Sequence, residues 1–339
     1  MSTNIPNFAP PENFTPVFPP EVSVEQKEVF IEFSNYVNTI LLSEEDPLHQ
    51  AERSWVTDAC LKRYLRASKW HLSEAKARIR YTLEWRREYK PADIEPERVE
   101  PEVVTGKLHI NGFDKHGRPI IYLRPGLENT KAGPRQVLAV VFMFECAIKL
   151  MPEDVENIVI IVDFHECSAR RSPGLGIAKE FMHVLGSHYP ERLAMALVVN
   201  APWYFWGFFK LLSPFIDPVT KNKIKFVDLE NPDRMKSNPQ WINILDCIDK
   251  DQLENEYGGN QEFVYNQEIY WDTLLKKIGK NIKENVFAKT PMPNISVILR
   301  LIVTFQRPAL VSNEFNPFRE CFEELGIGCL DTKELPFQN

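Results

Sequence analysis

The sequence predicts an α/β protein with an N-terminal helical lobe followed by a lobe that is built on a mainly parallel sheet. Apolar residues recur at helical spacing from Val29 to Leu83. Beyond Pro119, strand-like and helix-like runs alternate, which is typical of parallel strands joined by crossover helices. The run 158–162 (Ile-Val-Ile-Ile-Val) is apolar throughout, as expected for a central strand that is buried on both faces.

The helical lobe is predicted over residues 23–95. Residues 1–22 are rich in Pro and Asn and are predicted to be disordered. Helical signals begin at Ser23, which makes a capping box with Gln26. The next helical stretch, 54–69, is basic, and a third follows it before prolines close the region. These features describe a small helical domain.

The α/β lobe is predicted over residues 100–265. Its strand-like runs are 119–123, 157–164, 196–200 and 223–227, and its helical runs are 134–151, 175–187 and 203–212. Pro134 suits the first turn of a helix. The remainder, 266–339, is predicted to be a helical extension followed by a tail of unknown role.

Composition restricts the class of function. The net charge of −7 argues against nucleic-acid binding. The six cysteines show no CxxC pair, so neither a metal site nor a disulfide framework is expected. We expect no cofactor. The N-terminus does not resemble a signal peptide, and no run reaches the ~18–20 apolar residues of a membrane span. We expect a cytoplasmic protein that meets membranes at their surface.

An enzyme is not expected. GxGxxG, GxxxxGK[ST], GxSxG and HExxH are absent from the sequence. The run 163–166 (Asp-Phe-His-Glu) follows a predicted strand, where ligands of parallel sheets collect. Acid–base chemistry by Asp163 or His165 is one interpretation of this run, and a cluster that caps a loop is the other.

The helical run 203–212 is apolar around almost its whole circumference, with Lys210 as its single charge. A surface helix normally has a polar face, so this one must be buried, cover an apolar cavity or touch a membrane. Polar residues flank it on both sides. A phosphodiester headgroup between these flanks would need Lys or Arg donors. A structural ion pair between Glu191 and Lys223 is the alternative interpretation.

The chain resembles the CRAL-TRIO lipid-binding proteins, in particular the fungal phosphatidylinositol transfer proteins and their sterol-accepting branch linked to azole tolerance. The resemblance covers roughly residues 55–260. The matching segments are 63–70 (RYLRASKW), 84–87 (EWRR), 114–119 (DKHGRP), 189–193 (YPERL), 200–202 (NAP), 214–220 (PFIDPVT) and 257–259 (YGG).

The resemblance implies that the sheet floors an apolar lipid cavity and that the helix at 203–212 is a mobile gate. The gate residues would be Trp203, Phe205, Trp206, Phe209 and Leu212. The implied phosphatidylinositol headgroup site consists of Glu191, Lys223 and Lys69, with Thr220 and Asp217 at its border and Arg66 and Arg63 as phosphate donors.

The chain departs from relatives that also bind phosphatidylcholine. At four positions where those relatives carry two tyrosines, a serine and a threonine, this sequence carries Ile110, Ile121, Ile158 and Ile160. A buried phosphate without hydroxyl partners costs several kcal/mol. We therefore predict no phosphatidylcholine binding, and a sterol as the second ligand in an enlarged apolar cavity.

The predicted function is phosphatidylinositol transfer by a protein that associates peripherally with the endoplasmic reticulum, lipid droplets or the plasma membrane. The alternative is a lipid-gated scaffold that presents phosphatidylinositol to a lipid kinase or another protein through its tail, residues 286–339. An enzyme that uses the same cleft is the third and least favoured hypothesis.

Overall fold

The computed structural model describes residues 3–167, 175–202, 205–216, 218–230 and 240–280. All of them belong to the first of two compact units, Met1–Val286. The second unit, Phe287–Asn339, lies outside the described residues, and so does the tail proposed as a docking element.

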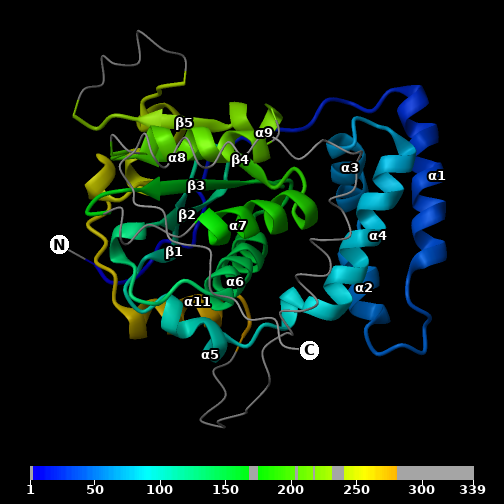
Figure 1. Ribbon diagram of the computed structural model, residues 1–339, viewed down its shortest axis with the longest axis horizontal. Helices are drawn as coiled ribbons and strands as arrows, with labels where there is room; N and C mark the ends of the chain where they lie inside the picture. The colour runs from blue at the N-terminus through cyan, green and yellow to red at the C-terminus, as the bar shows by residue number, and fades with distance from the viewer. Residues whose placement is uncertain (1–2, 168–174, 203–204, 217, 231–239, 281–339) are drawn as a thin grey trace, which may run out of the picture. The chain divides into compact units, whose positions relative to one another are not determined.

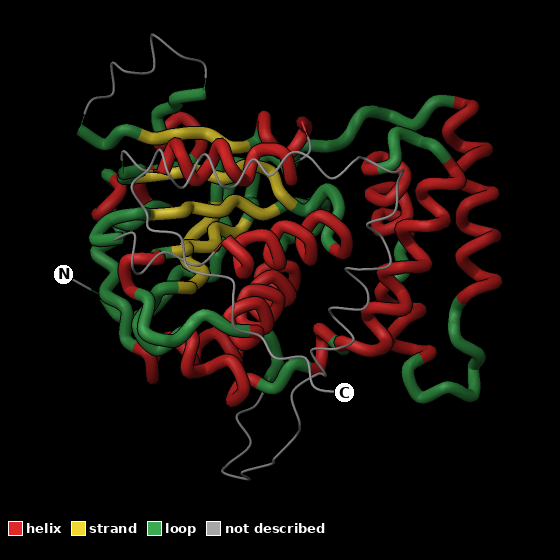
Figure 2. The backbone as a smooth tube through the Cα atoms, viewed as in Figure 1, coloured by secondary structure: helices red, strands yellow, loops and turns green. Residues whose placement is uncertain are grey.

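The helical lobe comprises α1 (Val24–Ile40), α2 (His49–Trp55), α3 (Asp58–Ala67) and α4 (Leu72–Tyr89). The capping box of Ser23 and Gln26 is present at the start of α1. The predicted stretch 54–69 is interrupted, because the Thr57 side chain accepts a hydrogen bond from Cys60 N and begins a new helix there. Figure 2 shows the four helices as a group of their own.

This lobe has its own hydrophobic core. Phe33 and Val37 of α1 pack with Cys60 and Leu65 of α3 and with Ile79 of α4, and each of these side chains is fully buried. The apolar stripe read from the sequence is therefore the stripe that the helices bury against one another.

The described residues contain a five-stranded sheet in the order β1-β2-β3-β4-β5. Its strands are β1 (Leu108–Phe113), β2 (Pro119–Leu123), β3 (Ile158–Asp163), β4 (Leu193–Val199) and β5 (Ile224–Val227). The β1–β2 pair is antiparallel and the other pairs are parallel. The predicted fold class, a helical lobe followed by a mainly parallel α/β lobe, is confirmed.

Helices α6 (Pro134–Leu150), α7 (Leu175–His188) and α8 (Phe205–Leu212) connect the strands. Figure 1 shows α6 and α7 in front of the sheet, with α8 beside β4 and β5. The opposite face packs against the segment 242–257. Helix α11 (Gln267–Lys277) packs against the core under α6. The short turns are η1 (Pro91–Asp93), α5 (Pro96–Val99), η2 (Glu100–Glu102), η3 (Pro125–Leu127), η4 (Ser213–Phe215), α9 (Pro218–Asn222), α10 (Ile244–Cys247), η6 (Lys250–Gln252) and η7 (Asn255–Tyr257).

Strand β1 was not predicted, because its sequence contains polar residues and a glycine. His109 and Asn111 are buried and both contact Glu254 Oε1 at 2.9 Å, so their polar groups are satisfied. Gly112 has φ +70°, and a Cβ there would lie 2.0 Å from the carbonyl oxygen of Gln252. Only glycine fits this close approach.

The N-terminal segment differs from the prediction that it is disordered. Within residues 3–9, the carbonyl oxygen of Asn7 accepts a hydrogen bond from Gly112 N at 2.9 Å. The Phe8 side chain is buried, with its ring 6.0 Å from that of Tyr270. The segment thus satisfies an edge amide of β1 and adds a ring to the core, partners that its Pro- and Asn-rich composition does not reveal.

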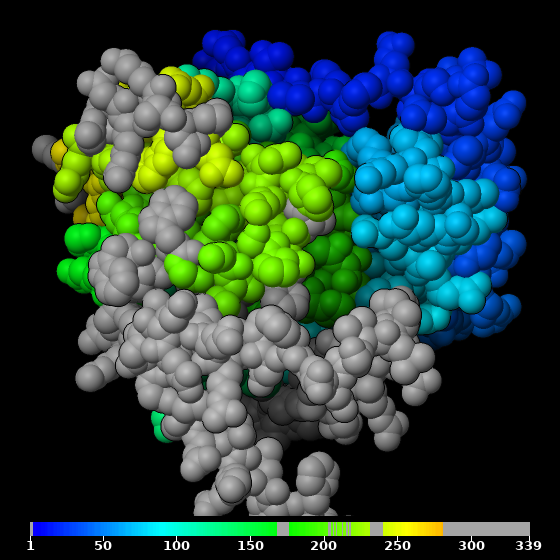
Figure 3. Space-filling model, turned by 45° about the horizontal axis from the view of Figure 1, so that its top comes forward, coloured from blue at the N-terminus to red at the C-terminus, as the bar shows by residue number. Residues whose placement is uncertain are grey.

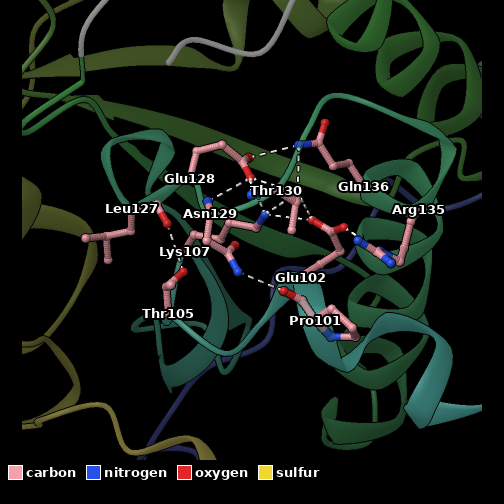
Figure 4. A network of polar contacts seen from close by, with 10 residues as sticks. All are labelled: Pro101, Glu102, Thr105, Lys107, Leu127, Glu128, Asn129, Thr130, Arg135 and Gln136. Atoms are coloured by element: carbon pink, nitrogen blue, oxygen red, sulfur yellow. Dashed lines mark hydrogen bonds and ion pairs between the residues drawn. The ribbon is translucent and has the colours of Figure 1, made fainter.

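A network of charged side chains joins η2, the start of β1 and the start of α6 (Figure 4). Lys107 Nζ donates to Glu102 Oε2 at 2.6 Å and also contacts Glu128 and Thr130, while Arg135 Nε donates to Glu102 Oε1 at 2.7 Å. Burial alone would raise the pKa of Glu102, but the hydrogen bonds from Arg135 and Lys107 outweigh it and lower that pKa. The network fixes α6 to the edge of the sheet.

Candidate functional site

Four isoleucines lie on one face of the sheet. Ile110 is paired with Ile121 across β1 and β2, and Ile121 is paired with Ile160 across β2 and β3. Ile158 lies two residues before Ile160 and therefore shares its face. All four belong to the core that includes α6 and are at most 7% exposed. The structure thus gathers the predicted cavity-wall residues into one apolar surface.

Along the row that contains Ile121 and Ile160, burial decreases from β1 toward β5. The row of cross-strand neighbours continues from Ile160 to Ala196 and then Ile224, which are only partly buried. The apolar side chains Phe181 and Leu185 of α7, packed over the same face, are also only partly buried. At the start of β4 and β5, apolar surface therefore stays partly accessible to solvent, whereas the isoleucines under α6 are buried.

Helix α8 covers the β4–β5 side of the same face. The ring of Phe205 is buried, 4.8 Å from that of Phe164 and 6.1 Å from that of Phe226. Phe209 is partly buried against Phe226, at 6.0 Å. Among the other predicted gate residues, Trp203 lies outside the described residues, and the same holds for the side chains of Trp206 and Leu212. Figure 3 shows the yellow-green surface to which α8 and α9 contribute, on the α/β lobe beside the light-blue helical lobe.

Arg63 and Arg66, the predicted phosphate donors, lie one turn apart on α3 and share one carboxylate. Arg63 Nη1 donates to Glu156 Oε1 at 3.0 Å, and Arg66 Nη2 donates to Glu156 Oε2 at 2.6 Å. Arg192 Nη1 donates to the backbone oxygen of Glu156 at 2.8 Å. Burial, and then the nearby charge of Arg63, lower the pKa of Arg192 to about 10. Three guanidinium groups thus converge on Glu156, two on its carboxylate and one on its backbone oxygen.

Glu191 lies in the same cluster, between α7 and β4. Its backbone oxygen accepts a hydrogen bond from Asn157 Nδ2 at 2.6 Å, and its φ is +58°. Lys69, just after α3, is exposed and also left-handed, with φ +49°. Such backbone strain in non-glycine residues gathers at functional sites.

Lys223 and Thr220 lie where α9 leads into β5. Lys223 N donates to the backbone oxygen of Thr220 at 3.0 Å, and Lys223 O accepts from Ala196 N at 2.9 Å. Glu191 precedes β4 and Lys223 precedes β5. Because β3, β4 and β5 are parallel, both residues lie at the amino-terminal end of the strands. No ion pair between Glu191 and Lys223 occurs in the described part of the chain. Asp217 lies outside the described residues.

Glu156 and Asn157 were not predicted as site residues. Glu156 is 90 residues from Arg66 in sequence, and no motif connects the two. Arg192 was visible in the matched segment 189–193, but its role was not recognised. The described residues contain no group of three or more His, Cys, Asp or Glu side chains that could hold a metal ion. None of the described helices is long and apolar enough to span a bilayer.

Comparison with known proteins agrees with this architecture. Residues 104–259 match the CRAL/TRIO domain, and residues 30–80 match the CRAL/TRIO N-terminal domain. The crystal structure of Sfh5 superimposes with a TM-score of 0.56 at 16% identity, over 84% of this chain and 100% of that one. At this identity the likeness shows the fold.

The relatives that match by sequence include fungal proteins. A CRAL-TRIO domain-containing protein of Schizosaccharomyces pombe is 45% identical over 69% of this chain and 22% of its own. The phosphatidylinositol transfer protein PDR17 of Saccharomyces cerevisiae is 36% identical, over 68% and 66%. The phosphatidylinositol transfer protein CSR1 of Eremothecium gossypii is 27% identical, over 66% and 53%. The chain spans less than two thirds of the length of each. On the two domain matches and these relatives, the chain belongs to the CRAL-TRIO family.

Proposed function

We propose that the protein transfers phosphatidylinositol between membranes, carrying one molecule at a time under α8, and accepts a sterol but no phosphatidylcholine. One observation carries the proposal. A partly accessible apolar surface on β4, β5 and α7 lies at the amino-terminal end of the parallel strands. Arg63, Arg66 and Arg192 gather around Glu156 at the same end. Two sequence relatives, PDR17 and CSR1, are named as phosphatidylinositol transfer proteins.

The apolar surface suits acyl chains. Side chains such as Ala196, Ile224 and Phe181 are only partly buried, so lipid that covers them removes apolar area from water. Each Å² removed contributes about 25 cal/mol. Helix α8 would cover the chains from the other side, and it must open for the lipid to exchange.

The arginine cluster suits a phosphate. Arg63 and Arg66 share the carboxylate of Glu156, and Arg192 donates to the backbone oxygen of the same residue, so three guanidinium groups surround Glu156. A lipid phosphate would supply negative charge and charge-assisted acceptors to such a cluster. Glu191 and Lys223, at the same end of the strands, would then hold the hydroxyls and the phosphate of an inositol headgroup.

The isoleucine surface argues against phosphatidylcholine and in favour of a sterol. Ile110, Ile121 and Ile158 are at most 1% exposed and Ile160 is 7% exposed, so this wall offers no hydroxyl to a second phosphate. A choline headgroup placed there would leave its phosphate without partners. A sterol has one hydroxyl and does not require them.

Transfer of labelled phosphatidylinositol between vesicles tests the proposal. We expect the wild-type chain to transfer it, and the double variant Glu191→Ala, Lys223→Ala to lose transfer. A matched double variant, Glu153→Ala, Lys225→Ala, makes the same charge changes at an exposed loop residue and two residues further along β5. It should transfer normally. Normal transfer by the first variant would refute the assigned headgroup site, and no transfer by the wild type would refute the function.

A further inference from the structure

Asp163, at the carboxyl end of β3, binds three other segments of the α/β lobe. Its side chain is 3% exposed. Oδ1 accepts hydrogen bonds from Asn200 Nδ2 at 2.8 Å and from His165 N at 2.9 Å, and Oδ2 accepts from Tyr257 OH at 2.8 Å. Arg124 Nε lies 3.7 Å from Oδ2. The capping interpretation of the run 163–166 therefore matches the contacts, and they extend well beyond the loop itself.

Asn200 is the residue at which the chain leaves β4 toward α8. Its φ is +53°, a left-handed conformation that costs most side chains about 1 kcal/mol and that asparagine tolerates better. Ala201 and Pro202 follow, and the Pro202 oxygen accepts a hydrogen bond from Phe205 N at 2.9 Å in the first turn of α8. The direction of the backbone at Asn200 therefore determines where α8 begins.

A second contact connects the same strand end to α8. Phe164 N donates to the Val199 oxygen at 3.0 Å, and the ring of Phe164 lies 4.8 Å from that of Phe205. Asp163 and Phe164 thus contact both Asn200, where the chain leaves β4, and the first ring of α8. Loss of the Asp163–Asn200 hydrogen bond would release the backbone turn while leaving the β-ladder intact.

We infer that the hydrogen bond between Asp163 and Asn200 is a latch that holds α8 against the sheet, so that Asp163 is a positioning residue for lipid exchange. The inference rests on the proposed function of α8 as a gate. The latch lies at the carboxyl ends of the strands, opposite the proposed headgroup site at their amino ends. It would set how often α8 opens without touching the headgroup.

Two variants of the residues around this carboxylate separate a latch from a purely structural role. Asn200→Gly removes the amide donor but keeps the left-handed backbone free of strain. Tyr257→Phe removes a hydrogen bond of equal length from the other oxygen of the same carboxylate and keeps the ring. The first variant breaks the contact between Asp163 and the segment that leads into α8, and the second leaves that contact in place.

Hydrogen exchange of the amides in 205–212, measured without lipid, is the direct readout. We expect Asn200→Gly to speed exchange there about tenfold, equivalent to about 1.4 kcal/mol, and Tyr257→Phe to leave it near the wild-type rate. Release of bound phosphatidylinositol should be faster in Asn200→Gly. Equal exchange in both variants, or unchanged exchange in Asn200→Gly, would overturn the latch. If the wild type fails to transfer phosphatidylinositol, the function falls, whereas the exchange measurement still decides the latch.

Discussion

Ile121 and Ile160 are direct neighbours across the parallel pair β2–β3, and together they form the centre of the isoleucine surface. Both are buried, Ile121 to 1% exposure and Ile160 to 7%. The absence of hydroxyl groups at this point is what distinguishes the proposed lipid site from one that holds a choline headgroup. Whether this surface offers a polar partner to a hydroxyl can be measured.

Comparison of Ile160→Thr with Ile160→Val measures the cost of placing a hydroxyl on this surface, because Thr has a hydroxyl where Val has a methyl and the two side chains have nearly the same shape. We expect the threonine variant to unfold at lower urea, with a free energy of unfolding about 1–3 kcal/mol below that of the valine variant. The valine variant controls for the lost methylene. Equal stability of the two would mean that the hydroxyl finds a partner, and the wall would not be apolar as we describe it.

The contact of Phe8 with the core predicts that the N-terminal segment stabilises the fold. Phe8→Ala should lower the free energy of unfolding by about 3 kcal/mol, because Phe8 is only 8% exposed. Phe18 is 64% exposed, and Phe18→Ala should change it by less than about 0.5 kcal/mol. Denaturant unfolding of both variants provides the measurement. An equally small effect of both substitutions would show that Phe8 does not stabilise the core, and would favour the prediction from composition that residues 1–22 are disordered.

His188 predicts a loss of stability in acid. Its ring stacks on Trp85 at 4.1 Å, and burial, followed by the nearby charges of His183 and Arg86, lowers its pKa to about 3. Unfolding restores the ordinary pKa of 6.5 to His188. Between pH 6.5 and about 3, His188 is therefore protonated in the unfolded chain and neutral in the folded chain. Stability is therefore lost as the pH falls through this window, by about 2 kcal/mol at pH 5.

His188→Phe keeps a ring against Trp85 and cannot titrate. We expect its free energy of unfolding to fall less than that of the wild type between pH 7 and pH 5. His165→Gln removes a histidine whose side chain is 64% exposed, and it should retain the wild-type pH dependence. An unchanged slope in His188→Phe would show that His188 does not contribute to the acid sensitivity.

Gly207 predicts the effect of stiffening α8. A Cβ built there meets no described atom within 4 Å, so alanine adds no clash, and it favours the helix by up to about 1 kcal/mol. Gly207→Ala should slow both amide exchange in α8 and transfer of phosphatidylinositol between vesicles, by up to about fivefold. Gly186→Ala makes the same change in α7, also without a contact within 4 Å, and should not affect α8. Faster or unchanged transfer by Gly207→Ala would contradict the role of α8 as the gate.

Local pattern predicted much of the fold. The strand 119–123 was predicted to the residue, and α6 to within one residue, because both have continuous apolar runs and Pro134 marks the start of a helix. The apolar helix at 203–212 also corresponds to α8, which begins at Phe205. In each case the signal lies within the segment itself.

The features that were missed depend on partners far away in the sequence. Nothing near Asn7 shows that it will complete the edge of β1, since its partner Gly112 is 105 residues away. Glu156 is likewise invisible as the counter-charge of Arg63 and Arg66, because its role follows from the packing of two lobes. Asn200 was recognised only as part of a family segment. Its left-handed turn and its bond to Asp163 are properties of the folded chain.

Lipid extraction from the purified protein, followed by mass spectrometry, tests the central claim most directly. It identifies the ligand that the protein selects from a cell, without a choice of substrate by the experimenter. We predict that phosphatidylinositol is the main phospholipid recovered and that sterol accompanies it. Phosphatidylcholine as the main lipid would contradict both the headgroup assignment and our interpretation of the four isoleucines.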